Sequence, residues 1–381
     1  MELDFDPEHE DLRDSVRSVL AAECPISLVR DIVDTRFGGG ASEPTRLIEQ
    51  MVALGWPALT VPEAAGGLGF GPIELALVTE ELGRALTPGP LFATLTQFVP
   101  MVTELGSVDD QETWLGPIAA GTGWGTVAIA EASGSIDPAA TTVDATPTAH
   151  GWELSGTKHF VVEPTAGGEI VVVAREMGTT NDDGIGAFIV PVDAIRVEPI
   201  DGADPSRVLA TVHLDQVAVT TDRMLGTPIP ATAAGIRRAN HVATVGLALD
   251  AVGAAQQAFD VSLEYVKQRE QFGVPIGSFQ AIKHKFADML ILLERARSLS
   301  YYAALTIAED DDRRALATAM AKAAAGDAVA RIAKEAIQVH GGIGYTWESD
   351  VHLYVRRIES DALLYGNANQ HRQDVATLIG V

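Results

Sequence analysis

The chain has 381 residues, one cysteine and a net charge of −25 from 52 acidic and 27 basic residues. The length predicts two or three domains, the acidity argues against nucleic acid and anionic membranes as partners, and Cys24 alone can form neither an internal disulfide nor a cysteine-based zinc site. No stretch approaches the roughly 18 uninterrupted apolar residues of a membrane span, and the acidic start lacks the features of a signal peptide. We therefore expect a cytoplasmic globular protein without a metal site.

Residues 1–118 carry the pattern of a helical domain. Apolar residues recur at the helix period over residues 12–20, and Pro25 ends that helix. Further helices are expected at 45–54 and 73–86.

The glycine-rich stretch over residues 61–72 lies between these two helices. It does not spell the Gly-x-Gly-x-x-Gly fingerprint of dinucleotide-binding sites, and no strand is expected before it. We therefore interpret it as a loop.

Residues 119–222 change to the period of two and the β-branched runs that indicate strands. No helical pattern separates these strands, so the segment predicts a small antiparallel β domain and argues against a doubly wound nicotinamide-binding sheet. The expected strands cover residues 126–130, 160–162, 169–174, 185–190 and 210–214.

Residues 223–381 predict a C-terminal four-helix-bundle domain. Long helices are expected at 231–268, 279–309 and 310–340, with a final one from Asn369. The first is apolar almost all round its middle, which predicts burial in the bundle or between subunits. We expect the surplus apolar surface of this helix to support a tetramer.

Two motifs near helix ends carry the strongest functional signal. The first is Gln338-x-x-Gly341-Gly342-x-Gly-Tyr, which alone is an ordinary helix C-terminus more often than a ligand site. The second is Arg269-Glu-Gln-Phe-Gly, followed at a set spacing by Gln280. Together they resemble the motifs of the acyl-CoA dehydrogenases, and the resemblance extends over nearly the whole chain. It implies an α+β fold with an N-terminal helical domain, a middle antiparallel β domain and a C-terminal helical bundle.

The resemblance implies FAD as the cofactor, shared across a dimer interface. Arginine suits the pyrophosphate because its guanidinium offers a fixed fork of donors. The motif from Gln338 to Gly342 would meet the adenylate end of a flavin held by a neighbouring subunit. The FAD contacts implied by the two motifs are Arg269, Phe272, Gln280, Gln338, Gly341 and Gly342.

The β domain of the family supplies the wall beside the isoalloxazine ring. Its two pieces match residues 130–135 and 156–162, which assigns Ala130, Ser135, Phe160 and Val162 to the flavin. Both pieces depart from the family pattern. Ala130 replaces a threonine and Val162 replaces a hydroxyl residue, and each lost hydrogen bond is worth roughly 0.5–1.5 kcal/mol.

The carboxylate that acts as base in the family is missing from both of its known positions. Gly366 follows Tyr365 where most members have glutamate, and Ala243, 26 residues before Arg269, occupies the alternative helix position. Losing a positioned base costs about 10²–10⁴ in rate. His241 is a weak substitute because a polar or interface role is the commoner one for such a residue. The same holds for Glu359 and Asp361, for which solvation or pairing with Arg356 or Arg357 is expected.

The closing segment over residues 346–372 resembles an actinobacterial branch that acts on steroid side chains and other bulky acyl-CoA thioesters. Some of its enzymes are heterotetramers of two related chains, only one of which carries the base. The implied function is FAD-dependent oxidation of the α,β bond of a CoA thioester, with an electron-transfer flavoprotein as acceptor. The alternative is a base-lacking subunit of a heterotetramer with a paralogous chain. A third hypothesis is an acyl-CoA-binding protein with a degenerate flavin site.

Overall fold

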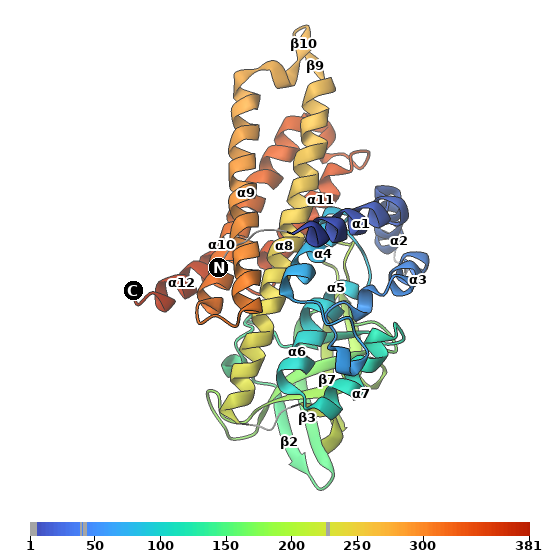
Figure 1. Ribbon diagram of the computed structural model, residues 1–381, viewed down its shortest axis with the longest axis vertical. Helices are drawn as coiled ribbons and strands as arrows, with labels where there is room; N and C mark the ends of the chain where they lie inside the picture. Colours follow the sequence, from blue (N-terminus) through green and yellow to red (C-terminus); the bar gives the residue numbers. More distant parts are fainter. Residues whose placement is uncertain (1–5, 39, 41–43, 226–228) are drawn as a thin grey trace.

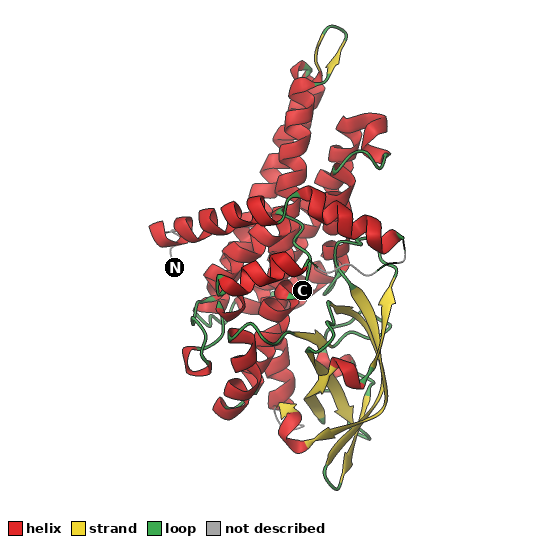
Figure 2. Ribbon diagram, turned by 90° about the vertical axis from the view of Figure 1, so that its right-hand side faces the viewer, coloured by secondary structure: helices red, strands yellow, loops and turns green. Residues whose placement is uncertain are grey.

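The computed structural model describes residues 6–38, 40, 44–225 and 229–381. It has a helical N-terminal region, a central β-sheet and a helical C-terminal region, which confirms the predicted fold class. Figure 2 shows the sheet gathered beside one end of the helices. The exact boundaries expected between the three domains, 118/119 and 222/223, stay a prediction.

The N-terminal region consists of short helices whose starts are marked by local signals. Asp6 caps the first helix by accepting from the His9 amide at 2.9 Å, and Ser107 forms a capping box with Asp110 before the last. The helices expected at 45–54 and 73–86 match α3 and α4. The helices are α1 (Pro7–Glu23), α2 (Ile26–Phe37), α3 (Thr45–Ala53), α4 (Pro72–Arg84), α5 (Leu91–Ala93), α6 (Val99–Leu105) and α7 (Val108–Ala119), with a π-helical turn at Thr94–Phe98 between α5 and α6.

The central sheet follows the order β6-β7-β3-β2-β4-β5-β8, and β1 pairs with β4. Most neighbours are antiparallel as expected, but β4 pairs in parallel with both β1 and β2. The strands at 144–148 and 196–200 were not among the expected ones, because both are half polar and contain proline. The strands are β1 (Gly125–Ala128), β2 (Asp144–Thr148), β3 (Gly151–Val162), β4 (Glu169–Glu176), β5 (Ile185–Pro191), β6 (Arg196–Ile200), β7 (Leu209–Thr220) and β8 (Met224–Leu225).

The C-terminal region is built around one long helix, α8 (Pro230–Gln268), which runs from the sheet to the far end of the molecule (Figure 1). It packs against α4 at two glycines: a Cβ on Gly253 would lie 1.9 Å from the Glu80 carbonyl oxygen, and one on Gly83 would lie 2.0 Å from that of Asp250. The remaining helices are α9 (Gln280–Ala308), α10 (Arg314–His340), α11 (Val351–Leu363) and α12 (Ala368–Leu378).

By length and composition alone, α8 could cross a membrane, yet 83% of its most apolar window is buried inside the protein. Residues 243–255 are all buried by neighbouring elements of the same chain. Residues 243–255 of α8 therefore belong to the core of this chain. Burial in the bundle, one of the two alternatives expected for this helix, is therefore what the structure shows, and the tetramer stays a prediction.

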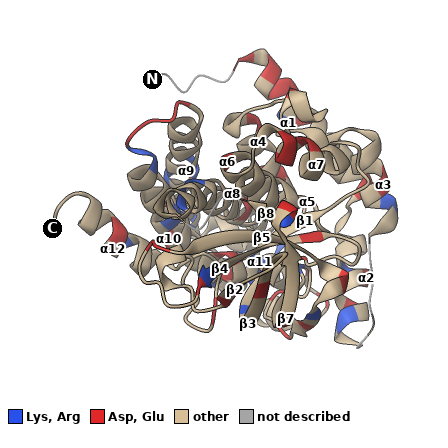
Figure 3. Cartoon of the chain, turned by 90° about the horizontal axis from the view of Figure 1, so that it is seen from below, with Lys and Arg blue, Asp and Glu red and all other residues tan. Residues whose placement is uncertain are grey.

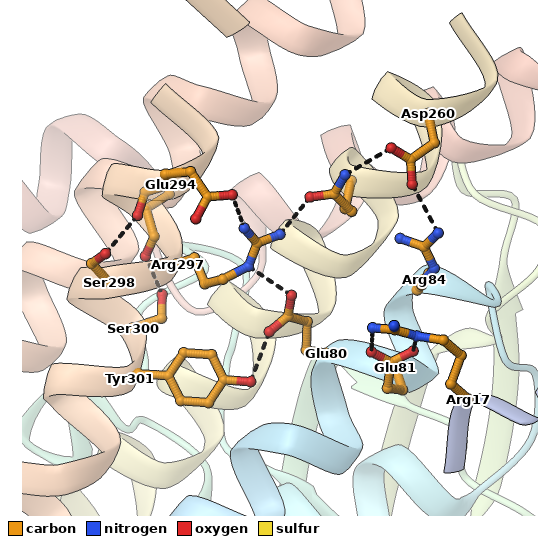
Figure 4. Close-up of polar contacts among 12 residues, drawn as sticks. Arg17, Glu80, Glu81, Arg84, Asp260, Glu294, Arg297, Ser298, Ser300 and Tyr301 are labelled. Carbon is orange, nitrogen blue, oxygen red and sulfur yellow. Dashed lines mark hydrogen bonds and ion pairs between the residues drawn. The ribbon is translucent and has the colours of Figure 1, made fainter. Parts of the chain in front are cut away.

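A polar network joins the N-terminal helices to the bundle (Figure 4). Glu80 on α4 accepts from Arg297 Nε at 2.9 Å and from the Tyr301 hydroxyl at 2.7 Å. One turn along α4, Arg84 pairs with Asp260 of α8 at 2.8 Å. These contacts fix the orientation of α4 against α8 and α9, and so support the close glycine packing between α4 and α8.

Candidate active site

The first predicted FAD motif lies in a hairpin at the free end of α8. Arg269 ends the helix, and its carbonyl oxygen accepts from the Ile276 amide at 2.8 Å, which closes the turn between β9 (Glu270–Gln271) and β10 (Val274–Pro275). Phe272 has a φ of +55° and is 93% exposed. Arg269 and Gln280 are also exposed. The hairpin thus presents the predicted contacts outward, away from the chain's own core.

The second motif lies near the first because the ends of α8 and α10 are in contact. The Tyr265 ring stacks on the ring of His340 with centroids 4.4 Å apart. Gly341 then leaves the helix with a φ of +65°, and a Cβ on Gly341 or Gly342 would find no atom within 4 Å. Gln338 is exposed beside them. A groove of about 410 Å³ borders this contact and is lined by residues of α8 and by His340.

The predicted flavin wall lies at the opposite end of α8. Phe160 is 40% exposed and has a φ of +57°, whereas Val162 and Ala130 are buried. Ser135 lies in the following loop, where its hydroxyl accepts from the Asp137 amide at 3.2 Å. The side chain of Asn240 on α8 holds the same loop through the Ile136 carbonyl oxygen at 3.0 Å.

The two sets of predicted flavin contacts are therefore far apart within one chain (Figure 1). From Asn240 to Arg269 an α-helix rises roughly 44 Å. One flavin cannot lie against the wall and the hairpin of the same chain.

The two empty base positions converge on one apolar cluster. Ala243 is 2% exposed and belongs to the same buried cluster as Val162 and Tyr365. Gly366 follows Tyr365 with a φ of +96°, and a Cβ there would lie 3.0 Å from His371 Nε2. That nitrogen donates to the Tyr365 carbonyl oxygen at 2.9 Å, so the His371 side chain holds the backbone at Tyr365 in place.

His241 lies outside this cluster. It is two residues from Ala243, which on an α-helix is a rotation of about 200°. Burial and, to a smaller extent, the nearby cations Arg314 and Arg238 together lower the pKa of His241 to about 4. The imidazole is therefore neutral near pH 7. Glu359 is exposed on α11.

Asp361 belongs to a buried charge network that was not predicted from the sequence. Arg207 Nη1 donates to Asp361 at 2.5 Å and Arg207 Nη2 lies 3.1 Å from Asp250. Arg357 reaches Asp204 at 2.6 Å and Asp250 at 3.4 Å. Asp361 pairs with Arg207 instead of the Arg357 favoured by its sequence neighbourhood.

Burial raises the pKa of Asp361 well above its ordinary value. Burial acts in the same direction on Asp250, but Arg207 and Arg357 outweigh it and lower the pKa of Asp250. The network joins the loop before β7 to α8 and α11, and it engages Asp361 away from solvent. The one signal in the sequence was Asp250 itself, a lone acid in a long apolar run.

Figure 3 shows acidic positions spread over the helices and the sheet, with basic positions between them. An anionic cofactor therefore needs individually placed cations such as Arg269. Within the described parts of the chain, no group of three or more His, Cys, Asp or Glu side chains could hold a metal ion.

Comparisons with known proteins agree with this architecture. The family models for the acyl-CoA dehydrogenase N-terminal and C-terminal domains match residues 6–122 and 236–379. The probable acyl-CoA dehydrogenase YngJ of Bacillus subtilis is 31% identical, over 82% of this chain and 84% of that protein.

Two solved structures are similar over nearly their whole length. The Tcur3481–Tcur3483 steroid ACAD is 29% identical with a TM-score of 0.84, over 98% of this chain and 97% of that one. The butyryl-CoA dehydrogenase of Megasphaera elsdenii is 25% identical with a TM-score of 0.88, over 100% of both chains.

Proposed function

Because the chain belongs to the acyl-CoA dehydrogenase family, we propose that it is a FAD-binding chain of an enzyme that oxidises the α,β bond of a CoA thioester. The electrons would pass to an electron-transfer flavoprotein. The observation that carries the proposal is the exposure of predicted flavin contacts at both ends of α8, with Arg269, Phe272 and Gln338 at one end and Phe160 at the other.

The residues at both ends fit a flavin dinucleotide. Arg269 offers an exposed guanidinium, and Gly341 and Gly342 have open space where a side chain would stand, so a backbone can approach a ligand closely there. At the other end, the Phe160 ring is free to cover a flat aromatic system. When bound, FAD supplies the acceptor for the hydride that leaves the β carbon of the substrate.

The chain's own residues bind, orient and exclude water. Arg269 would neutralise the pyrophosphate, and Phe160 would fix the plane of the ring system. The cluster around Ala243 and Tyr365 is apolar, so a carboxylate placed there would be poorly solvated and a stronger base. That is the environment in which a proton α to a thioester carbonyl is removed most readily.

The absence of a carboxylate at both base positions favours the alternative that the chain is a base-lacking, non-catalytic subunit of a heteromeric acyl-CoA dehydrogenase. Gly366 and Ala243 cannot accept a proton. His241 lies near two arginines, Asp361 is held by Arg207, and Glu359 lies at the surface. In this alternative the chain completes the flavin site of a paralogous chain that carries the base.

We further propose a cytoplasmic homo- or heterotetramer. The Tcur3481–Tcur3483 steroid ACAD is similar to this chain over nearly its full length. The exposed apolar side chains that would be covered lie on α9 and near the C-terminal ends of α10 and α12: Leu290, Ile291, Ile343, Leu378 and Ile379.

The experiment is to measure flavin bound to the purified chain, alone and co-expressed with a paralogous chain that carries the base. Arg269→Ala should lose most of the bound flavin, because a hydrogen bond to a charged group is worth about 1.5–3 kcal/mol. The matched control is Lys267→Ala, which removes a neighbouring exposed cation that pairs with Glu264. Equal flavin content in both variants and the wild type would refute the assignment of Arg269.

A further inference from the structure

Lys158 is a fully buried lysine in the middle of β3. Its side chain is 0% exposed, and Nζ donates to the Ile129 carbonyl oxygen at 3.0 Å and to Glu131 Oε1 at 2.8 Å. Burying an ammonium group is costly, and a buried pair is weak evidence of net stabilisation. A role other than stability is therefore worth seeking for this lysine.

Glu131 extends the contact to a third segment. Its carboxylate accepts from the amides of Thr142 at 2.9 Å and Val143 at 3.1 Å, and from the Thr142 hydroxyl. The pair thus joins β3, the segment at 129–131 and the two residues before β2. The backbone adds one direct bond between the first two, from the His159 amide to the Ala130 carbonyl oxygen at 2.9 Å.

The pair lies next to an irregularity in β3. The register between β3 and β7 shifts between Lys158 and Val161, and Phe160 in that interval has a φ of +57°. In a regular strand, residues two apart point to the same face, so Phe160 would be buried like Lys158. The bulge turns it outward, to 40% exposure, as bulges beside active sites do.

We propose that Lys158 and Glu131 are positioning residues for the flavin wall. Lys158 ties the bulge that presents Phe160 to the segment that carries Ala130, so the two pieces of the wall keep one relative orientation. Neither side chain need touch the flavin. The inference rests on the proposed FAD function, and it adds the two residues that hold the binding surface in shape.

The test compares Lys158→Met and the double variant Lys158→Met/Glu131→Gln with the wild type, each in the full chain and with its partner chain where one is needed. We expect the dissociation constant for FAD to rise at least tenfold and the visible circular dichroism of bound flavin to change. The double variant leaves no unpaired buried carboxylate, so it keeps the inference testable if Lys158→Met fails to fold. Far-ultraviolet circular dichroism and light scattering confirm the fold and the assembly.

Arg223→Met is the matched control, because it removes another cation paired with a glutamate in the same sheet, at 2.9 Å from Glu169, without touching either piece of the wall. It should bind FAD as the wild type does. A folded double variant with wild-type affinity and an unchanged flavin spectrum would overturn the positioning role. If the wild type itself binds no FAD, the proposed function is refuted. If the wild type binds FAD and the folded double variant binds it equally well, only the positioning role is refuted.

Discussion

Restoring the missing carboxylate is the perturbation that the structure defines best. Ala243 has a helical backbone and lies in the apolar cluster that also contains Tyr365. Glutamate there would overpack the cluster at a cost of about 1–3 kcal/mol, which a domain stable by roughly 5–15 kcal/mol tolerates. Burial raises the pKa of a carboxyl group toward neutrality, which suits a general base.

Gly366 is the poorer position for the same change. Its φ of +96° makes any side chain strained, by about 1–3 kcal/mol. A Cβ 3.0 Å from His371 Nε2 would also disturb the bond from His371 to the Tyr365 carbonyl oxygen, worth about 1 kcal/mol. We therefore expect Ala243→Glu to gain more activity than Gly366→Glu.

The assay is oxidation of a panel of acyl-CoAs, bulky acyl groups included, with an artificial electron acceptor. Because a positioned base is worth about 10²–10⁴ in rate, Ala243→Glu should exceed the wild type by about 10² or more. Ala243→Gln has nearly the same shape but accepts no proton, so it should stay at the wild-type level. Equal rates for the two flavin-loaded variants would refute the reasoning that only the proton acceptor is missing.

Three further predictions follow from individual residues. Phe160→Gly should relieve backbone strain, so denaturant titration should give an unfolding free energy that is unchanged or up to about 1 kcal/mol higher. Flavin affinity, measured by flavin binding, should nevertheless fall. A parallel fall in unfolding free energy and flavin affinity would contradict a binding role for the ring. His241 has a folded-state pKa of about 4 against 6.5, so its contribution to stability is complete above pH 6.5 and is lost as the pH falls toward 4; urea unfolding at a series of pH values should show a smaller acid loss for His241→Gln, with catalytic rates unchanged. Light scattering should find a tetramer, which Ile291→Glu on the exposed face of α9 should weaken; a wild-type monomer at micromolar concentration would exclude the shared site.

Local signals in the sequence were sufficient to predict most helices and strands, but not the contacts between them. The helix at 231–268 and the strand run at 169–174 were predicted because period and composition are local properties. The outward turn of Phe160 depends on a bulge set by pairing with β7, residues that are distant in sequence. The network around Arg207 and Arg357 likewise needs three separate segments to fold together.

For the candidate site too, the sequence predicted the residues but not how they are arranged in space. The resemblance supplied the residues, and the geometry added that the two groups of predicted flavin contacts lie too far apart for one cofactor within one chain. It also placed Ala243 and Tyr365 in one cluster, although 122 positions of sequence separate them. The vacancy at Gly366 was visible in the sequence, but its left-handed backbone was not.

The central claim is that the chain binds FAD while its own site lacks a base. It is tested most directly by mixing the flavin-loaded wild-type chain, without a paralogous partner, with acyl-CoAs under anaerobic conditions and following the flavin absorbance by stopped flow. We predict that the flavin of this chain stays oxidised, and that Ala243→Glu restores bleaching. Rapid bleaching of the wild-type flavin by any acyl-CoA would contradict it.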